Sequence, residues 1–121
     1  MRNRIYEESN VDPVFAESLR ATCPRNDGIG NSNLSPFDIV SPNIFDNNYF
    51  KDLMEMKGLL LSDQVLLNGR DTAFADAQVA LYSNDQDASF SNFQVSMVNM
   101  GNIKPLTGTN GQIRKDCRNP N

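Results

Sequence analysis

The sequence of 121 residues contains no histidine and no tryptophan, and it has only two cysteines. The lack of histidine removes the commonest general base, the His-dependent catalytic triads and the imidazole ligands of haem, zinc and copper. Cys23 and Cys117 lie far apart in the chain, which excludes a four-cysteine zinc site and a C-x-x-C redox motif. Counting alone leaves open one long-range disulfide or two free thiols.

An excess of positive charge and long apolar runs are missing as well. The formal net charge is -4, and the acidic residues are spread along the chain, so no basic stripe is present to neutralise phosphates. No apolar run approaches the roughly 20 residues that span a bilayer, and the first residues lack the apolar stretch of a signal peptide. We therefore expect no nucleic-acid partner, no membrane contact and, for the chain as written, no export signal.

The composition is that of a globular protein, with 39% hydrophobic and 21% charged residues. The length suits one domain, and neither an internal repeat nor a convincing linker divides it. Asp12 and Pro13 predict the start of a helix over 13–22, which ends before Pro24. Residues 26–42 are rich in Gly, Asn, Ser and Pro, which predicts an irregular loop.

Three further helices are predicted from apolar periodicity. Phe45, Tyr49, Leu53 and Met56 form one stripe, which Gly58 should terminate. A second helix is expected over 71–82, with Asp71 or Thr72 as its cap, and the third carries its apolar stripe from Phe90 to Met100, with Asp87 as its cap and Gly101 at its end. The tail after it should consist of turns, so the predicted fold class is all-α with long irregular loops.

Several segments occur in an order and spacing that resemble those of the class III (secretory plant) haem peroxidases. The resemblance covers essentially the whole chain and is carried by Arg4-Ile5-Tyr6, Leu19-Arg20-Ala21-Thr22-Cys23-Pro24, Phe45-Asp46-Asn47-Asn48-Tyr49-Phe50, Lys57-Gly58-Leu59, Ser62-Asp63-Gln64, Met100-Gly101-Asn102-Ile103, Pro105-Leu106-Thr107-Gly108, Gly111-Gln112-Ile113-Arg114 and Cys117-Arg118. It implies that residues 1–121 form a partial peroxidase domain, the incomplete C-terminal, proximal portion of that helical fold.

The resemblance also implies a function. Family members use haem b and calcium, reduce hydrogen peroxide while oxidising phenolic donors, and act in the response to oxidative stress. They are extracellular or vacuolar, whereas this chain as written would stay cytosolic. Their distal Arg and His and their proximal His have no counterpart here, so we predict an inactive fragment without a catalytic residue. The expected partner is a complementary N-terminal portion. The alternative is a non-enzymatic, small helical module that binds calcium or another protein.

Asp38, Ser41, Ile44 and Asp46 are the candidate metal ligands. Carboxylate, hydroxyl and carbonyl oxygens are the hard ligands that calcium prefers. By resemblance these residues form the proximal calcium loop and give five oxygens, whereas calcium usually takes six to eight. The balance comes in the family from a Thr that follows the proximal His and is missing here. Without the resemblance, Asp38 is a turn residue and Asp46 a helix cap.

Three residues are candidates for the haem side of the domain. By resemblance, Asp63 accepts a hydrogen bond from the proximal imidazole, Phe37 packs beside that imidazole, and Leu60 forms part of the pocket wall. By pattern alone, Asp63 is an exposed loop carboxylate, and Phe37 and Leu60 are ordinary core residues. The resemblance matches Cys23 and Cys117 to cysteines that pair with upstream partners, so both are expected as free thiols here.

Overall fold

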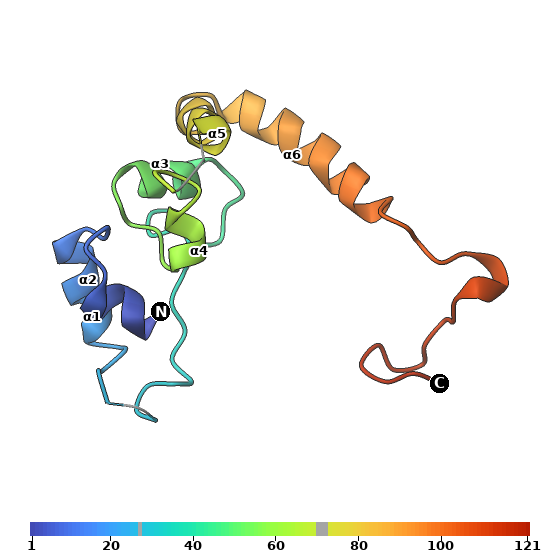
Figure 1. The fold of residues 1–121 in the computed structure, drawn as a ribbon, viewed down its shortest axis with the longest axis horizontal. Helices are drawn as coiled ribbons and strands as arrows, with labels where there is room; N and C mark the ends of the chain where they lie inside the picture. Colours follow the sequence, from blue (N-terminus) through green and yellow to red (C-terminus); the bar gives the residue numbers. More distant parts are fainter. Residues whose placement is uncertain (27, 70–72) are drawn as a thin grey trace. The chain divides into compact units, whose positions relative to one another are not determined.

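The computed structural model describes residues 1–26, 28–69 and 73–121, and within these ranges it contains helices and no strand. The elements are, in order, α1 (Arg2–Glu7), α2 (Pro13–Arg20), α3 (Asn48–Met54), α4 (Leu61–Gln64), α5 (Ala73–Asn84), α6 (Gln86–Gly101) and the short 3-10 helix η1 (Gly108–Asn110) (Figure 1). The predicted all-α class is thereby confirmed. The chain divides into two compact units, Met1–Phe90 and Ser91–Asn121, which we call unit 1 and unit 2.

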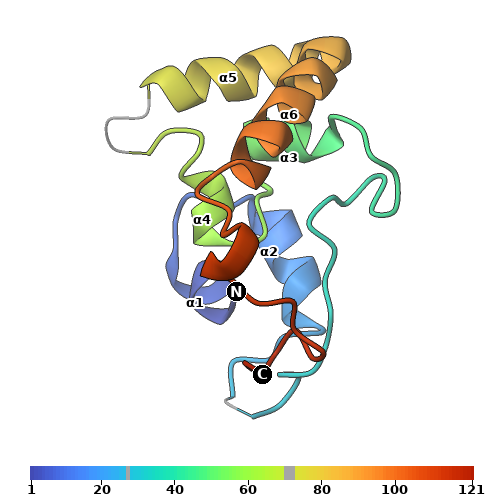
Figure 2. The same cartoon turned by 90° about the vertical axis from the view of Figure 1, so that its right-hand side faces the viewer.

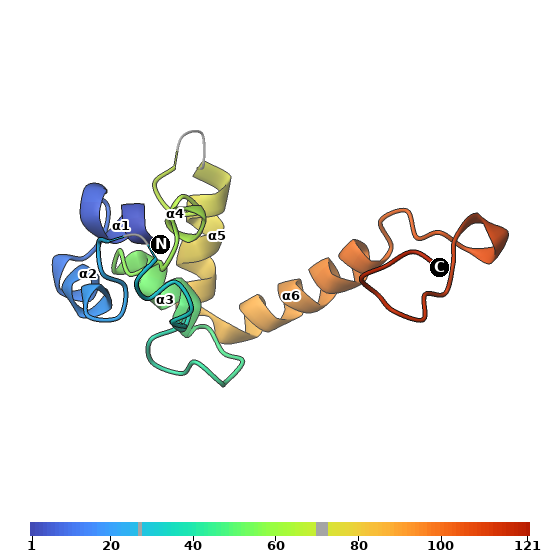
Figure 3. The same ribbon diagram turned by 90° about the horizontal axis from the view of Figure 1, so that it is seen from below.

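The core of unit 1 forms where α1 packs against α2 (Figure 3). Its buried members are Ile5, Ala16, Leu19, Cys23 and Leu59. The helix α2 begins as predicted, because Asp12 Oδ1 accepts a hydrogen bond from the Phe15 N–H at 2.7 Å and Pro13 occupies the first helical position. It ends at Arg20, two residues before the predicted end.

A buried arginine ties α1 to the chain around α4. Arg4 is only 2% exposed, and its Nε donates to the Gly58 carbonyl at 3.0 Å. Its Nη1 meets Glu8 Oε2 at 3.0 Å, while its Nη2 donates to the Asn10 carbonyl at 2.9 Å and to Gln64 Oε1 at 3.3 Å. A buried guanidinium is tolerated only when its donors are satisfied, and this one has partners on every nitrogen.

The helix α3 is shorter at both ends than its apolar stripe predicts. It starts at Asn48, three residues after Phe45, and ends at Met54. Met56, rather than Gly58, takes the left-handed conformation that closes the helix, with a φ of 58°. Gly58 serves packing instead, since a Cβ at this position would lie 2.9 Å from Leu53 Cδ2. The prediction that Gly58 terminates this helix was therefore wrong.

The helix α5 packs across α3, as Figure 2 shows. The Phe50 and Tyr82 rings lie 5.0 Å apart, and Asn47 Nδ2 donates to the Tyr82 carbonyl at 2.9 Å. The predicted helix over 71–82 thus exists, although its expected cap, Asp71 or Thr72, lies outside the described residues.

The long helix α6 confirms the clearest sequence pattern, but its cap differs from the prediction. Asp85 Oδ1 accepts a hydrogen bond from the Ala88 N–H at 2.9 Å, so Asp85 is the capping residue and Asp87 lies inside the helix. Residues 91–121 of unit 2 are all exposed. Among the described helices, none has both the length and the apolar character needed to cross a bilayer.

Candidate functional site

Two carboxylates converge on one hydroxyl in the loop before α3. Ser41 is 8% exposed, and its Oγ lies 3.0 Å from Asp38 Oδ2 and 2.6 Å from Asp46 Oδ2. A hydroxyl carries one proton and can donate to only one of these oxygens at a time. The Asn48 Nδ2 adds further donors, to Ser41 Oγ at 2.6 Å and to Asp46 Oδ2 at 3.0 Å.

The other oxygen of each carboxylate holds the backbone of the loop. Asp38 Oδ1 accepts from the N–H groups of Val40 and Ser41 at 2.8 and 2.9 Å. Asp46 Oδ1 accepts from the Asn48 N–H at 2.8 Å. Both Oδ2 atoms are thereby turned towards Ser41. Asp38 and Asp46 thus each use Oδ1 to hold the backbone of the loop and Oδ2 to contact the Ser41 hydroxyl.

Hydrogen bonding also fixes the charge of this cluster. The Ser41 hydroxyl, followed by the Asn48 N–H, holds the pKa of the Asp46 carboxyl below its ordinary value. Asp46 therefore stays anionic at neutral pH.

Ile44 closes the same turn. Its N–H donates to the Ser41 carbonyl at 2.9 Å, while its side chain is 68% exposed.

The loop offers part of a calcium ligand set. Two anionic carboxylates, a hydroxyl and backbone carbonyls are the oxygen ligands that calcium prefers. Within the described ranges, no group of three or more His, Cys, Asp or Glu residues is placed to hold a metal ion. A cation here would therefore depend on the two carboxylates together with neutral oxygens, and the residues present fit an incomplete calcium site.

Asp63, the third residue of α4, makes a second set of polar contacts. Its Oδ2 accepts from the Leu60 N–H at 2.8 Å, and its Oδ1 accepts from the Tyr49 hydroxyl at 3.3 Å. Burial, together with the negative charge of Asp63, raises the pKa of Tyr49 well above its usual range. Asp63 is a half-buried helical residue, so the interpretation by pattern alone, an exposed loop carboxylate, was wrong.

The two apolar candidates have different surroundings. Leu60 is half-buried, and its side chain packs against the core of unit 1. Its N–H makes the hydrogen bond to Asp63 just described. Phe37 is 55% exposed, which departs from the core position that its pattern suggested. The chain contains no histidine, so these residues surround no imidazole of its own and do not fit haem ligation unaided.

Sequence reasoning missed three residues that shape these sites. Asn48 joins the Ser41 cluster, and Tyr49 contacts Asp63. Asp52 is 5% exposed, and its Oδ2 accepts from the Ile39 N–H at 3.0 Å, which fastens the loop to α3. Burial raises the pKa of Asp52. Only the proximity of Asn48 to Asp46 in the sequence could have signalled any of these contacts.

Both cysteines are free thiols, with Cys23 buried and Cys117 exposed. The free state agrees with the expectation for residues 1–121. It leaves the fold of unit 1 dependent on packing and hydrogen bonds rather than on a covalent cross-link.

Comparison with known proteins identifies similar chains. The family model described as "Peroxidase" matches residues 1–85. The chain is 52% identical over 120 residues to Peroxidase 2 of Oryza sativa subsp. indica, with 99% of this chain and 37% of that protein covered. It is 50% identical over 117 residues to Peroxidase RIP1 of Medicago truncatula, with 97% and 35% covered. The chain thus spans little more than a third of the length of these relatives.

Proposed function

Because this chain belongs to the peroxidase family, we propose that it forms the C-terminal, haem-proximal part of an enzyme that reduces hydrogen peroxide while it oxidises phenolic donors. The observation that carries the proposal is the identity of 52% over 99% of this chain to Peroxidase 2 of Oryza sativa subsp. indica. Residues 1–121 are then one portion of a larger helical domain. Haem, when bound in such an enzyme, supplies the redox centre at which peroxide is cleaved.

The proposed role of Asp63 is to hold an imidazole supplied from outside these residues. A carboxylate can accept about four hydrogen bonds, and the structure gives Asp63 two, from Leu60 and Tyr49. The carboxylate therefore retains acceptor capacity while both of its oxygens are oriented. An imidazole N–H bonded to it would become a more basic ligand on its other nitrogen. Leu60 and Phe37 would supply apolar surface beside it.

We propose that the chain by itself has no peroxidase turnover. Peroxide cleavage needs a positioned base to move a proton and a cation to stabilise the separating oxygens, and no histidine is present to do the first. The expected partner is a complementary N-terminal peroxidase portion. By family resemblance, the assembled enzyme works outside the cytosol, in the extracellular space or the vacuole, in the response to oxidative stress.

The test is reconstitution. The purified chain is refolded with haem, with and without the N-terminal portion of Peroxidase 2 of Oryza sativa, and guaiacol oxidation and the Soret band are recorded. We expect the chain alone to match free haem and the mixture to exceed it clearly. Asp63→Asn should weaken the mixture, whereas the matched control Asp116→Asn, in an exposed turn of unit 2, should not. Turnover by the chain alone, or a mixture no better than free haem, would contradict the proposal.

A second proposed function is calcium binding by the loop of Asp38, Ser41, Ile44 and Asp46. The supporting observation is that both Oδ2 atoms already face one hydroxyl, where a cation would relieve the repulsion between the two carboxylates. This function remains available to a non-enzymatic module, because the loop lies entirely within unit 1. Water would complete the coordination, at reduced affinity.

Calorimetric titration with calcium separates the two functions. Asp38→Asn and Asp46→Asn should each abolish any heat of binding, whereas Asp116→Asn should leave it unchanged. Binding to the chain alone, combined with failure of the reconstitution, would favour the module. A chain that binds no calcium, yet gains activity with its partner, would leave only the enzyme.

A further inference from the structure

Tyr49 and Asp63 bring a phenol and a carboxylate together inside unit 1. The Tyr49 hydroxyl donates to Asp63 Oδ1 at 3.3 Å, while the Leu60 N–H holds the other carboxylate oxygen at 2.8 Å. Tyr49 is half-buried on α3, and its ring meets the Phe50 ring edge-on, with 5.3 Å between the ring centres. This packing helps to hold the hydroxyl towards Asp63.

The pair is suited to a reaction that neither group performs alone. Burial and the charge of Asp63 raise the pKa of Tyr49 well above its usual range, so Tyr49 is a neutral phenol at neutral pH. A phenol that loses an electron becomes a strong acid, and the loss is easiest when a base already accepts its hydrogen bond. The Asp63 carboxylate is such a base, because it can take the proton along the existing contact.

Tyr6 has the opposite surroundings. Its hydroxyl donates to the Cys23 carbonyl at 3.2 Å, and a backbone carbonyl accepts a hydrogen bond without keeping the proton. The guanidinium carbons of Arg20 and Arg25 lie 5.1 and 5.4 Å from the centre of the Tyr6 ring. Two cations at this distance disfavour the loss of an electron from the ring. Tyr6 and Tyr49 are both half-buried, so their partners rather than their exposure distinguish them.

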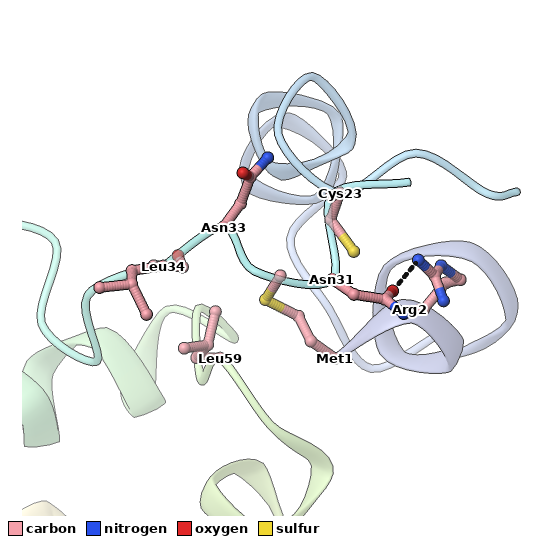
Figure 4. Close-up of a pocket in the computed structure, with 9 residues that line it drawn as sticks. Met1, Arg2, Cys23, Asn31, Asn33, Leu34 and Leu59 are labelled. Atoms are coloured by element: carbon pink, nitrogen blue, oxygen red, sulfur yellow. Dashed lines mark hydrogen bonds between the residues drawn. The ribbon is translucent and has the colours of Figure 1, made fainter. Parts of the chain in front are cut away.

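The buried thiol of Cys23 is an oxidisable group without a neighbouring carboxylate. It lines a pocket of about 300 Å³ together with Arg2, Asn31 and Leu59 (Figure 4). Among the described residues that line this pocket, none is Asp or Glu. The thiolate is the reactive form of cysteine, and no carboxylate in the pocket is placed to take the proton. Tyr49 thus combines an oxidisable group with a proton acceptor, whereas Cys23 does not.

We propose that Tyr49 is a redox-active tyrosine, which gives an electron to a strong one-electron oxidant while its phenolic proton moves to Asp63. The O–H bond of Tyr49 breaks, an O–H bond forms on Asp63 Oδ1, and the oxidant is reduced by one electron. A neutral tyrosyl radical remains on Tyr49. An electron returned by a reductant brings the proton back from Asp63 and restores both groups. In the enzyme proposed above, hydrogen peroxide would be the ultimate oxidant, and this physiological role alone rests on the proposed function.

The test oxidises the full chain with a photogenerated ruthenium(III) tris-bipyridine complex in the absence of haem. Electron paramagnetic resonance counts the tyrosyl radicals, and transient absorption gives their rate of formation. Tyr49→Phe keeps the ring but lacks the phenolic proton, so most of the rapidly formed radical should disappear. The controls Tyr6→Phe and Tyr82→Phe should retain it. In the unchanged chain the radical should form more slowly in heavy water, because the O–H bond breaks in the same step.

Asp63→Asn tests the role of the carboxylate. An amide does not take up the proton, so we expect the radical to form at least about tenfold more slowly than in the unchanged chain. The matched control Asp116→Asn, in an exposed turn of unit 2, should leave the rate unchanged. Circular dichroism checks the folding of each variant. If Asp63→Asn does not fold, Tyr49→Phe and the comparison in heavy water decide the proposal.

An undiminished radical signal in Tyr49→Phe would overturn the proposal. So would a folded Asp63→Asn variant that forms the radical as fast as the unchanged chain, or a rate that heavy water does not alter. Because haem and the N-terminal portion are both absent, these outcomes concern Tyr49 and Asp63 alone. They are independent of the reconstitution that tests the proposed function.

Discussion

Unit 1 and unit 2 differ in what holds their helices in place. In unit 1, Leu53 is fully buried, and Arg4 binds groups that lie 54 and 60 residues further along the chain. In unit 2, residues 91–121 are all exposed, and the apolar side chains of Val95, Met97, Val98 and Met100 on α6 are 44–60% exposed. Unit 1 has a core of its own, whereas unit 2 has helical periodicity without a core.

The difference shows that an apolar stripe can specify a helix without specifying what covers it. Helices draw most of their stability in proteins from tertiary packing of an apolar face. Since unit 2 does not bury its stripe internally, we infer that the stripe is completed by a surface outside unit 2. Under the proposed function, the rest of a peroxidase domain would supply this surface, since the chain covers 37% of its relative.

The largest effect is expected from Arg4→Met. The change leaves the acceptors on Gly58, Asn10 and Gln64 without their buried donor, and we expect a loss of about 4 kcal/mol in the free energy of unfolding of unit 1. Urea unfolding followed by circular dichroism measures it. The matched control Arg114→Met, in the exposed tail, should change stability by less than about 0.5 kcal/mol. Equal effects would abolish the contrast between the units.

Leu53→Ala should cost somewhat less, about 3 kcal/mol, because it creates a cavity at a side chain with 0% exposure. Its control, Val95→Ala on α6, removes a side chain that is 60% exposed and should be nearly neutral. The same unfolding assay compares them. A large cost at Val95 would show that α6 is packed in the isolated chain.

Asp12→Ala removes a helix cap and should destabilise unit 1 by about 1 kcal/mol, because the Phe15 N–H loses its acceptor. Asp85→Ala removes the corresponding cap of α6. That change should lower the helix content by circular dichroism and should shift the unfolding midpoint less than Asp12→Ala does, because most of α6 lies beyond Phe90, where unit 1 ends. A larger shift for Asp85→Ala than for Asp12→Ala would contradict this expectation.

The smallest effects concern pH, and two carboxylates of unit 1 should act in opposite directions. The pKa of Asp46 is lowered by the Ser41 hydroxyl, so its stabilisation is present above the ordinary carboxyl pKa and is lost as the pH falls through the lowered value. Asp46→Asn should therefore flatten the acid limb of the stability profile.

The pKa of Asp52 is raised by burial, so the folded chain binds this proton more tightly and gains stability as the pH falls through the raised value. Asp52→Asn should remove that gain. Unfolding midpoints measured across the acid range in the two variants check both signs. The same direction of change in both variants would refute the assigned causes.

The sequence predicted those elements whose signals are local. The helix α2 follows from Asp12-Pro13, and α6 from its long stripe and nearby glycine. The short helices α1 and α4 were missed, because six and four residues are too few for the apolar period of a helix to recur. The irregular loop over 26–42 was predicted from its composition, whereas the calcium role of the residues around Ser41 was predicted through resemblance and stays a prediction.

The contacts that sequence reasoning missed are those made between distant segments. Neither the bond from Tyr49 to Asp63 nor the bond from Arg4 to Gln64 leaves a local pattern, since each partner taken alone is an ordinary helical residue. The sequence does not signal the burial of Asp52 either, because the exposed residue beside it, Lys51, is also charged. Tertiary packing decides such contacts, and one sequence does not encode them as a periodicity.

Hydrogen exchange at the amides of residues 91–101 tests most directly the inference that the apolar stripe of α6 is completed by a surface outside unit 2. In the isolated chain these amides should exchange much faster than those of α3, and they should slow markedly when the N-terminal portion of Peroxidase 2 and haem are added. Protection equal to that of α3 in the isolated chain, unchanged by the partner, would contradict the account.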